Sequence, residues 1–196
     1  VANPDDLVLI YLSSHGSPSK ADVRGTNYLV AHNTDKNSLY ATGIAMPELC
    51  KMVKDRVHSD RVVLLLDACH SGAATPAAKG IFRQANFDAD IIAQGTGQLV
   101  ICSSEPSQIS WESNKYPNGV FTHYLIEGLR KQGDKTSLGT AFQFMKDQVQ
   151  QEVLHDRGEL QTPVLKSKWQ GNDLYLAAPP ANPGPPLTDS KLPGGH

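Results

Sequence analysis

A run of five aliphatic residues constrains the fold of this chain more than any other feature. Residues 62–66 read Val-Val-Leu-Leu-Leu and lie between Arg61 and Asp67. The run is far shorter than the roughly 20 apolar residues that a membrane helix needs, and it has no helical periodicity. Short aliphatic runs of this kind are typical of a central parallel strand that is buried on both faces. The sequence therefore predicts an α/β fold organised around this strand.

The residues that follow this strand can carry chemistry. The chain continues as Asp67-Ala-Cys-His-Ser-Gly72, so Cys69 lies where a strand passes into a loop, the usual place for functional side chains in an open α/β sheet. A second apolar run, residues 7–12, ends in the same way at His15 and Gly16. If the two strands are parallel neighbours, their carboxyl ends share one rim, and His15 and Cys69 can approach although 54 residues separate them. Taken singly, such a cysteine or histidine is usually structural, but together they predict a Cys–His catalytic pair.

The sequence around both residues resembles a known family. Ser14-His15-Gly16 and Asp67-Ala-Cys-His-Ser-Gly72 are similar to the two signatures of the caspase-like cysteine peptidases, and more to the metacaspase and orthocaspase branch than to caspases themselves. Gly119-Val-Phe-Thr-His-Tyr-Leu125 and Gln161-Thr-Pro163 match as well, so that the resemblance covers residues 6–176. It implies a three-layer α/β/α sandwich with a mainly parallel central sheet. The main departure from the caspase pattern is Asp67, where caspases carry Gln.

The resemblance also implies a mechanism. Cys69 would attack the peptide carbonyl and form an acyl-enzyme, and His15 would accept and deliver the proton. The backbone N–H groups of Gly16 and Cys69 would bind the oxyanion. No cofactor is needed for this chemistry. The resemblance alone suggests calcium as a regulator, but the acidic residues that could bind it are too scattered in the sequence to predict a site: Asp35, Asp88 and Asp90.

In the same way, the resemblance predicts the specificity of the S1 pocket. Asp67, two residues before the nucleophile, would line this pocket, Ser13 would border it, and Glu105 is a weaker candidate. A carboxylate there selects protein or peptide substrates with Arg or Lys at P1 and repels Asp. The alternative for Asp67 is an ordinary carboxylate that caps a turn at the end of a strand.

Two other functional classes stay open at this point. The first is a catalytically silent caspase-fold module that only binds other proteins, although packing alone does not require both His15 and Cys69. The second is a metal-binding module built from Cys69, His70 and His15, which lacks a fourth ligand at a spacing typical of zinc.

Length and composition bound the domain organisation and the partners. The chain of 196 residues fits one peptidase domain, predicted for residues 1–178, followed by a Pro- and Gly-rich tail or linker over residues 179–196. The net charge of −2 and the lack of basic runs argue against nucleic acid as a partner, and no apolar run approaches the length of a membrane span. The three cysteines give no disulfide framework, which favours a reducing compartment such as the cytoplasm. Two of them, Cys50 and Cys102, are predicted to pack in the core.

Two segments bear on activation. The family core begins with a strand and a helix before the His15 strand, and this chain, which starts at Val1 rather than Met, lacks them. We expect an upstream segment or a second chain to complete the fold. Residues 73–97 are rich in Gly and Pro breaks, which predicts an exposed loop. This loop contains Lys79 and Arg83, which a peptidase specific for basic residues could cut to activate itself, or which could be merely solvated charges.

The remaining periodicities predict the other elements. Helices are expected over residues 46–57, 119–130 and 137–155, strands over residues 26–31 and 98–103, and extended segments over residues 161–168 and 173–176.

Overall fold

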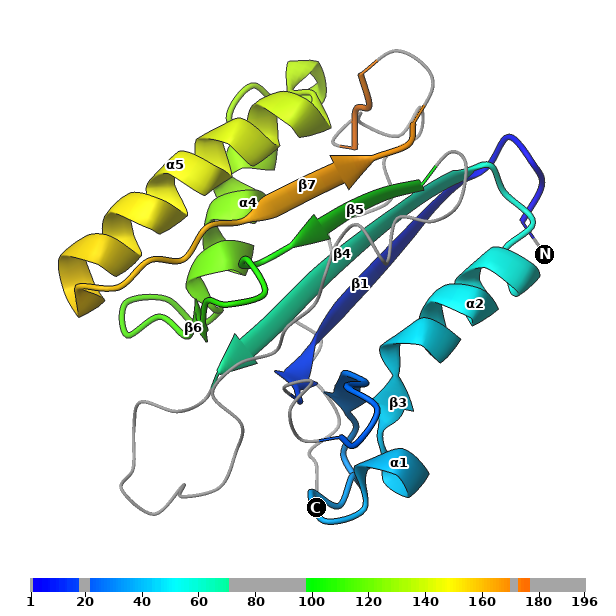
Figure 1. Ribbon diagram of the computed structural model, residues 1–196. Coiled ribbons are helices and arrows are strands. Elements are labelled where there is room, and N and C mark those ends of the chain that lie inside the picture. Colours follow the sequence, from blue (N-terminus) through cyan, green and yellow to red (C-terminus); the bar gives the residue numbers. More distant parts are fainter. Residues whose placement is uncertain (1, 18–21, 71–97, 170–172, 177–196) are drawn as a thin grey trace, which may run out of the picture.

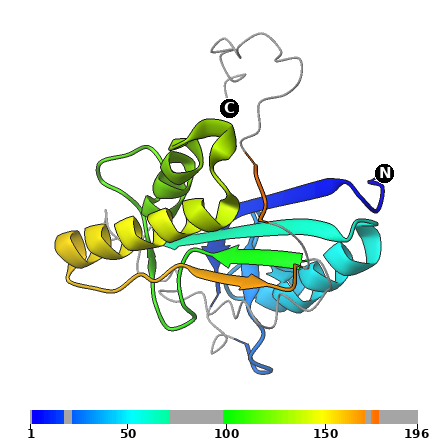
Figure 2. The ribbon, with the colours of Figure 1, turned by 90° about the horizontal axis from the view of Figure 1, so that it is seen from above.

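The computed structural model describes residues 2–17, 22–70, 98–169 and 173–176, with only the backbone of Lys54, Cys69 and His70. The predicted three-layer α/β/α sandwich is confirmed. Helices α4 (Val120–Arg130) and α5 (Leu138–Arg157) cover one face of the sheet, and α2 (Met46–Arg56) covers the other (Figures 1 and 2).

The seven-stranded sheet is parallel at its centre and antiparallel at its edges. Its central strands are β1 (Leu7–Gly16), β4 (Arg61–His70) and β5 (Gln98–Cys102), which run parallel to one another. Antiparallel strands β2 (Tyr28–Val30), β3 (Ile44–Ala45) and β7 (Val164–Ser167) complete the order β3-β2-β1-β4-β5-β7. A two-residue strand, β6 (Ser110–Trp111), pairs in parallel with the end of β4.

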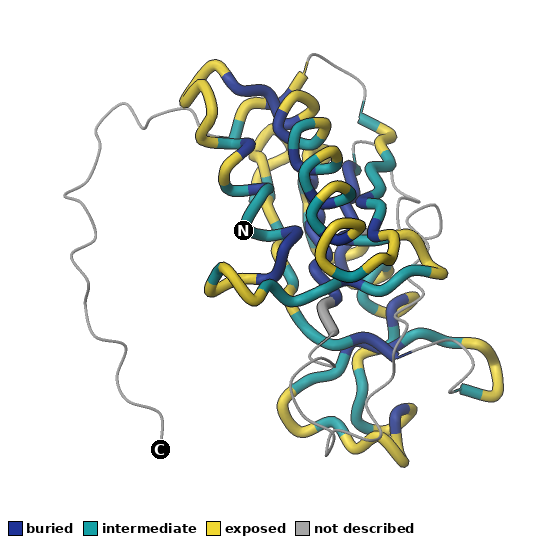
Figure 3. The backbone as a smooth tube through the Cα atoms, turned by 90° about the vertical axis from the view of Figure 1, so that its left-hand side faces the viewer, coloured by how far each residue is buried: buried dark blue, intermediate teal, exposed yellow. Residues whose placement is uncertain are grey.

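Two hydrophobic clusters fill the space between the layers, one on each face of the sheet. Because successive side chains of a strand point to opposite faces, alternate residues of β4 and β5 enter different clusters. The cluster on the α2 side contains Leu64, Leu66, Val100 and Cys102 with Leu49 and Cys50 of α2. The cluster on the other side contains Val63, Leu65, Leu99 and Ile101 with Phe121, Leu125, Met145 and Val149 of α4 and α5. The run at residues 62–66 is thus buried on both faces, as predicted (Figure 3).

The long helices agree with the predicted ones to within two residues. Ser137 caps α5 by accepting a hydrogen bond from the N–H of Thr140, and Gly158 ends this helix in the left-handed conformation, with φ of 67°. The shortest elements have no counterpart among the predictions, because two to four residues show no periodicity: α1 (Leu39–Thr42), β3, β6 and the 3-10 turn Gly133–Lys135. Within α2, Val53 is buried, whereas Met52 is 48% exposed.

Strand β1 differs from β4 in having one uncovered apolar face. Leu7, Leu9 and Tyr11 are 39%, 49% and 44% exposed, whereas Ile10 and Leu12 pack against the cluster on the α2 side. By register the exposed side chains lie beside Arg61, Val63 and Leu65 of β4, so they face the same side as α4 and α5.

Candidate active site

The register of β1 and β4 brings His15 and Cys69 to the same level of the sheet. Eight successive pairs, from Leu7 with Arg61 to Ser14 with Ala68, keep a constant offset of 54 residues. The next residues at this offset are His15 and Cys69. The prediction that these two strands are parallel neighbours is therefore confirmed, and their printed register ends one residue before His15 and Cys69.

The two strand ends take new neighbours at this level. His15 and Gly16 pair with Val30 and Leu29 of β2, and Cys69 and His70 pair with β6. The hydroxyl of Ser14 donates to the carbonyl oxygen of Val30 and so ties the same end of β1 to β2. Each half of the candidate dyad is thus held by its own short strand. Of the candidate dyad, the structure describes the half-buried side chain of His15 and the backbone of Cys69.

Asp67 lies beneath this rim and is 1% exposed. Its Oδ2 accepts a hydrogen bond from the hydroxyl of Thr122 in α4 at 2.5 Å, and Ser110 Oγ lies at 3.5 Å from Oδ1. Tyr11 and Thr122 are also bonded, at 2.7 Å between their oxygens. Because the Thr122 hydroxyl donates its one proton to Asp67, the Tyr11 hydroxyl is the donor to Thr122.

The two other predicted S1 residues lie in different surroundings. Ser13 is the register neighbour of Asp67 on β1, so the two side chains lie side by side on one face of the sheet, and Ser13 is exposed. Glu105 follows β5 in an exposed turn, where its carboxylate meets the amide of Gln108 at 3.4 Å. The register therefore groups Ser13 with Asp67 and leaves Glu105 on the turn after the next strand. Lys79 and Arg83 lie outside the described residues.

A buried polar network that the sequence did not predict adjoins Asp67. Gln161, with no exposed surface, accepts from the backbone N–H of Trp111 at 2.9 Å and donates to the carbonyl of Ser103 at 3.0 Å and to Ser110 Oγ at 3.2 Å. The motif Gln161-Thr-Pro163 was the only sequence signal for it. Trp111 packs against the cluster of α4 and α5, and the guanidinium of Arg157 lies 4.9 Å from its ring centre. It anchors the loop after β6 to α5.

The loop between β6 and α4 is held by charge and by ring stacking. Lys115 Nζ lies 2.7 Å from Asp156 of α5, and this hydrogen bond raises the pKa of Lys115 and lowers that of Asp156. Tyr116 stacks on His123 with ring centres 3.4 Å apart. Burial, with a hydrogen bond to Glu152 at 2.6 Å, raises the pKa of Tyr124. The first two contacts tie the loop to α5 and α4, and the third ties α4 to α5.

The other two cysteines have the packing role that was predicted for them. Cys102 is 2% exposed in the cluster on the α2 side, and Cys50 packs against that cluster. Burial raises the pKa of the Cys50 thiol, which lowers its thiolate fraction at neutral pH.

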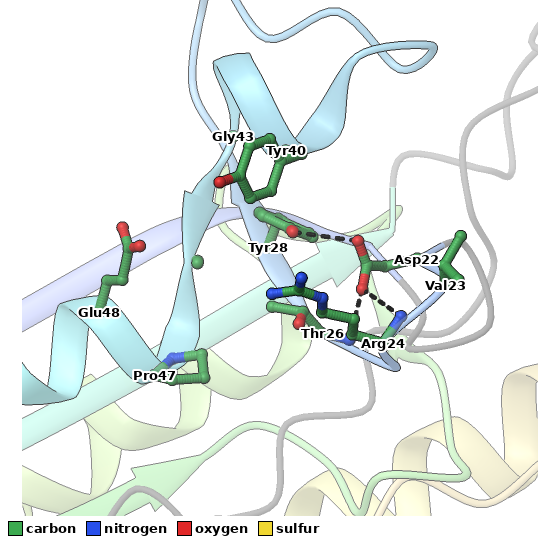
Figure 4. A pocket seen from close by; sticks show the side chains of 10 residues that line it. Asp22, Val23, Arg24, Thr26, Tyr28, Tyr40, Gly43, Pro47 and Glu48 are labelled. Atoms are coloured by element: carbon green, nitrogen blue, oxygen red, sulfur yellow. Dashed lines mark hydrogen bonds between the residues drawn. The ribbon is translucent and has the colours of Figure 1, made fainter.

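A cavity of about 490 Å³ lies away from the candidate dyad, between β2, α1 and the start of α2 (Figure 4). It contains none of the predicted site residues. The carboxylate of Asp22 at its edge already accepts from the backbone N–H groups of Thr26 and Arg24 and from the hydroxyl of Tyr28. The hydrogen bonds from Thr26 and Arg24 lower the pKa of Asp22. Its role is to shape the turn that leads into β2.

Neither a metal site nor a membrane helix is found in the described parts of the chain. There, no three His, Cys, Asp or Glu residues are grouped so that they could hold a metal ion. Asp35 is used locally and accepts from the backbone N–H of Asn37, while Asp88 and Asp90 lie outside the described residues. None of the described helices is long and apolar enough to cross a membrane.

Comparison with known proteins identifies the family. A model of the caspase domain matches residues 1–175. The chain therefore belongs to the caspase domain family, whose members are cysteine peptidases. The comparison with curated proteins finds no match.

Solved structures similar to the chain include two of an insect caspase. The crystal structure of caspase-1 from Spodoptera frugiperda is 16% identical, with a TM-score of 0.46, and the alignment covers 90% of this chain and 65% of that one. The structure of pro-sf-caspase-1 is also 16% identical, with a TM-score of 0.37 and coverage of 83% and 61%. The chain thus spans less than two thirds of the length of either protein.

Proposed function

We propose that this protein is a cysteine endopeptidase that cleaves after Arg or Lys, as metacaspases and orthocaspases do. The observation that supports the proposal is the parallel register of β1 and β4, whose last pair, Ser14 with Ala68, immediately precedes His15 and Cys69. The family provides a precedent for this chemistry. No step of the reaction needs a metal or a cofactor.

The proposed reaction uses the strand ends as follows. The sulfur of Cys69, as thiolate, attacks the scissile carbonyl carbon, and the backbone N–H groups of Gly16 and Cys69 stabilise the oxyanion. His15 takes the thiol proton and delivers it to the leaving amine, which leaves an acyl-enzyme. Water, activated by the same imidazole, then releases the new carboxyl end. The buried Gly16 backbone is held by β2, so a donor at this position is preorganised.

The preference for basic residues rests on Asp67 and its neighbour Ser13. Thr122 and Ser110 hold the Asp67 carboxylate in place beneath the rim. In this proposal a substrate guanidinium binds the carboxylate, and Arg should be preferred to Lys if the contact is bidentate. An ionised carboxylate at the same place would repel a P1 Asp.

The decisive experiment is turnover of fluorogenic peptides that end in Arg, Lys or Asp. The wild type should cleave after Arg and Lys and should not cleave after Asp. Cys69→Ala and His15→Ala should lose activity by several orders of magnitude, because each removes one half of the dyad. Circular dichroism of both variants must match the wild type, so that the loss reports chemistry rather than unfolding.

The other results of this experiment separate the alternatives. Full activity in either folded variant would remove the dyad assignment. Cleavage after Asp would contradict the specificity, and complete inactivity towards all three peptides would favour the catalytically silent interaction module.

Two further parts of the proposal concern the state in which the enzyme works. We propose that an upstream segment or a second chain covers the exposed apolar face of β1, and that cleavage after Lys79 or Arg83 controls activity. The partly and fully buried cysteines Cys50 and Cys102 fit a reducing compartment, which we propose to be the cytoplasm.

A further inference from the structure

We propose that Gln161 is a positioning residue that fixes β6 and, through β6, the backbone of the nucleophile strand. Its effect on turnover rests on the function proposed above, whereas its hold on β6 does not. Gln161 precedes β7 and contacts neither the candidate dyad nor Asp67 in the described hydrogen bonds.

The chemistry of the partners fixes how the Gln161 amide is oriented. The backbone N–H of Trp111 can only donate, so it must face Oε1, and the carbonyl of Ser103 can only accept, so it must face Nε2. The second Nε2 proton goes to Ser110 Oγ. One fully buried side chain thus joins the end of β5 to both residues of β6.

The segment around Gln161 is anchored without this side chain. The N–H of Thr162 donates to Oε1 of Gln108 at 2.5 Å, and the hydroxyl of Thr162 accepts from the amide of Gln150 in α5 at 3.2 Å. Burying an amide costs free energy unless its hydrogen bonds are made. Because other residues already hold the segment, the specific effect of the Gln161 hydrogen bonds is to position β6.

The placement of β6 matters because this strand is the described neighbour of the nucleophile. Ser110 and Trp111 are the register partners of Cys69 and His70. A strand of two residues has few ladder hydrogen bonds of its own, so side-chain anchors decide where it lies. Ser110 also borders Asp67. Loss of the Gln161 amide would therefore shift the Cys69 backbone, and a misplacement of about 1 Å at a reacting group can cost about 100-fold in rate.

The test compares Gln161→Met with the matched variant Gln143→Met, because the exposed Gln143 amide of α5 donates to Asp147 and takes no part in holding this segment. Methionine keeps the length of the side chain and removes all its hydrogen bonds. We expect Gln161→Met to lower kcat at least about 10-fold with KM within about twofold, while Gln143→Met stays within about twofold in both. Hydrogen exchange should quicken in peptides that contain residues 109–112 in Gln161→Met only. Alkylation of Cys69 by iodoacetamide, which needs no oxyanion donor, should change less than about twofold.

A second variant covers the case that Gln161→Met does not fold. In Gln161→Glu the carboxylate accepts from Trp111 but cannot donate to Ser103, whereas the protonated acid can. Its turnover relative to the wild type should therefore rise as the pH is lowered, which a general loss of stability would not produce.

Each result decides the proposal. Unchanged exchange over residues 109–112 in a folded Gln161→Met would overturn it, and so would faster exchange without loss of kcat. If the wild type cleaves no peptide, the proposed function fails, and the exchange comparison still decides whether Gln161 holds β6.

Discussion

The side chain of Asp67 is buried beneath the rim among polar residues. Thr122 donates to it directly, Tyr11 donates to Thr122, and Ser110 lies at hydrogen-bonding range. These hydroxyl groups belong to β1, β6 and α4, so they fix the carboxylate from three elements at once. A fixed acceptor of this kind suits the recognition of a positively charged side chain.

The prediction at this site concerns Asp67→Asn. Removing the charge while keeping the size should lower kcat/KM for P1 Arg by at least about 30-fold, because loss of one partner from a buried hydrogen-bonded charge pair costs about 2–5 kcal/mol. Cleavage after a neutral P1 residue should fall much less. Peptides that differ only at P1 measure both values.

Two variants make this measurement specific. Glu105→Gln removes an exposed carboxylate after β5 and should change the Arg preference less than about threefold. Thr122→Val removes the main donor to Asp67 and should raise KM for Arg peptides. If Glu105→Gln abolishes the preference while Asp67→Asn keeps it, Glu105 is the S1 carboxylate and Asp67 is a structural strand-end acid.

How much of the site the sequence predicts depends on how local each residue's role is. His15, Cys69 and Asp67 each follow an apolar strand, so strand patterning and parallel pairing were sufficient to bring them to one rim. Thr122 and Gln161 act only because α4 and the segment before β7 cross the end of β4. A pattern of apolar residues along the chain does not indicate which segments cross in space, so the roles of Thr122 and Gln161 could not be predicted from the sequence.

At the scale of elements, β1 shows a conflict between its sequence and its surroundings. Residues 7–12 are apolar at every position, as in a strand that is buried on both faces. The structure covers only the face of Ile10 and Leu12 and leaves Leu7, Leu9 and Tyr11 exposed. Apart from the pairing of His15 and Gly16 with β2, β1 pairs only with β4 in the described sheet. Its other edge can therefore accept a further strand. Both features favour an additional segment that docks here.

We therefore predict that the uncovered face of β1 binds apolar partners in the chain of 196 residues. Wild-type protein should enhance the fluorescence of an apolar dye such as ANS, and Leu9→Lys should reduce this signal at least about twofold, since it places a charge in the centre of the face. Val23→Lys is the matched control, because Val23 is equally apolar and fully exposed elsewhere. Light scattering shows whether a second copy occupies the face instead, in which case Leu9→Lys converts a dimer to a monomer.

A wild-type monomer that neither binds the dye nor responds to Leu9→Lys would contradict this prediction.

The sequence predicts the apolar character of β1 but not which of its faces stays exposed, because that depends on the neighbours of the strand. For the same reason, the predicted long helices agree with the structure, whereas the two-residue strands β3 and β6, which exist only through their partners, had no sequence signal.

At the scale of the whole molecule, one connection divides the fold. Residues 71–97, which lie outside the described parts, link β4 to β5. The preceding part holds β1, β2, β3, α2 and β4, and the following part holds β5, β6, β7, α4 and α5. Both hydrophobic clusters draw residues from both parts: Leu64 and Val100 belong to one, and Val63 and Phe121 belong to the other. The core therefore does not depend on the continuity of this connection.

The last prediction joins this architecture to activation. Freshly purified wild type should contain a break after Lys79 or Arg83, and Cys69→Ala should not, because an enzyme with a basic P1 preference carries its own substrate in this segment. The two pieces should elute together and separate only in denaturant, since β4 and β5 remain paired from Val62 with Gln98 to Leu66 with Cys102, and β4 also pairs with β6. Intact-mass spectrometry before and after size exclusion measures both results. The double variant Lys79→Gln and Arg83→Gln should stay whole and show lower turnover. An uncut wild-type chain with full activity would show that cleavage here is not the switch, and that a ligand or a partner opens the site.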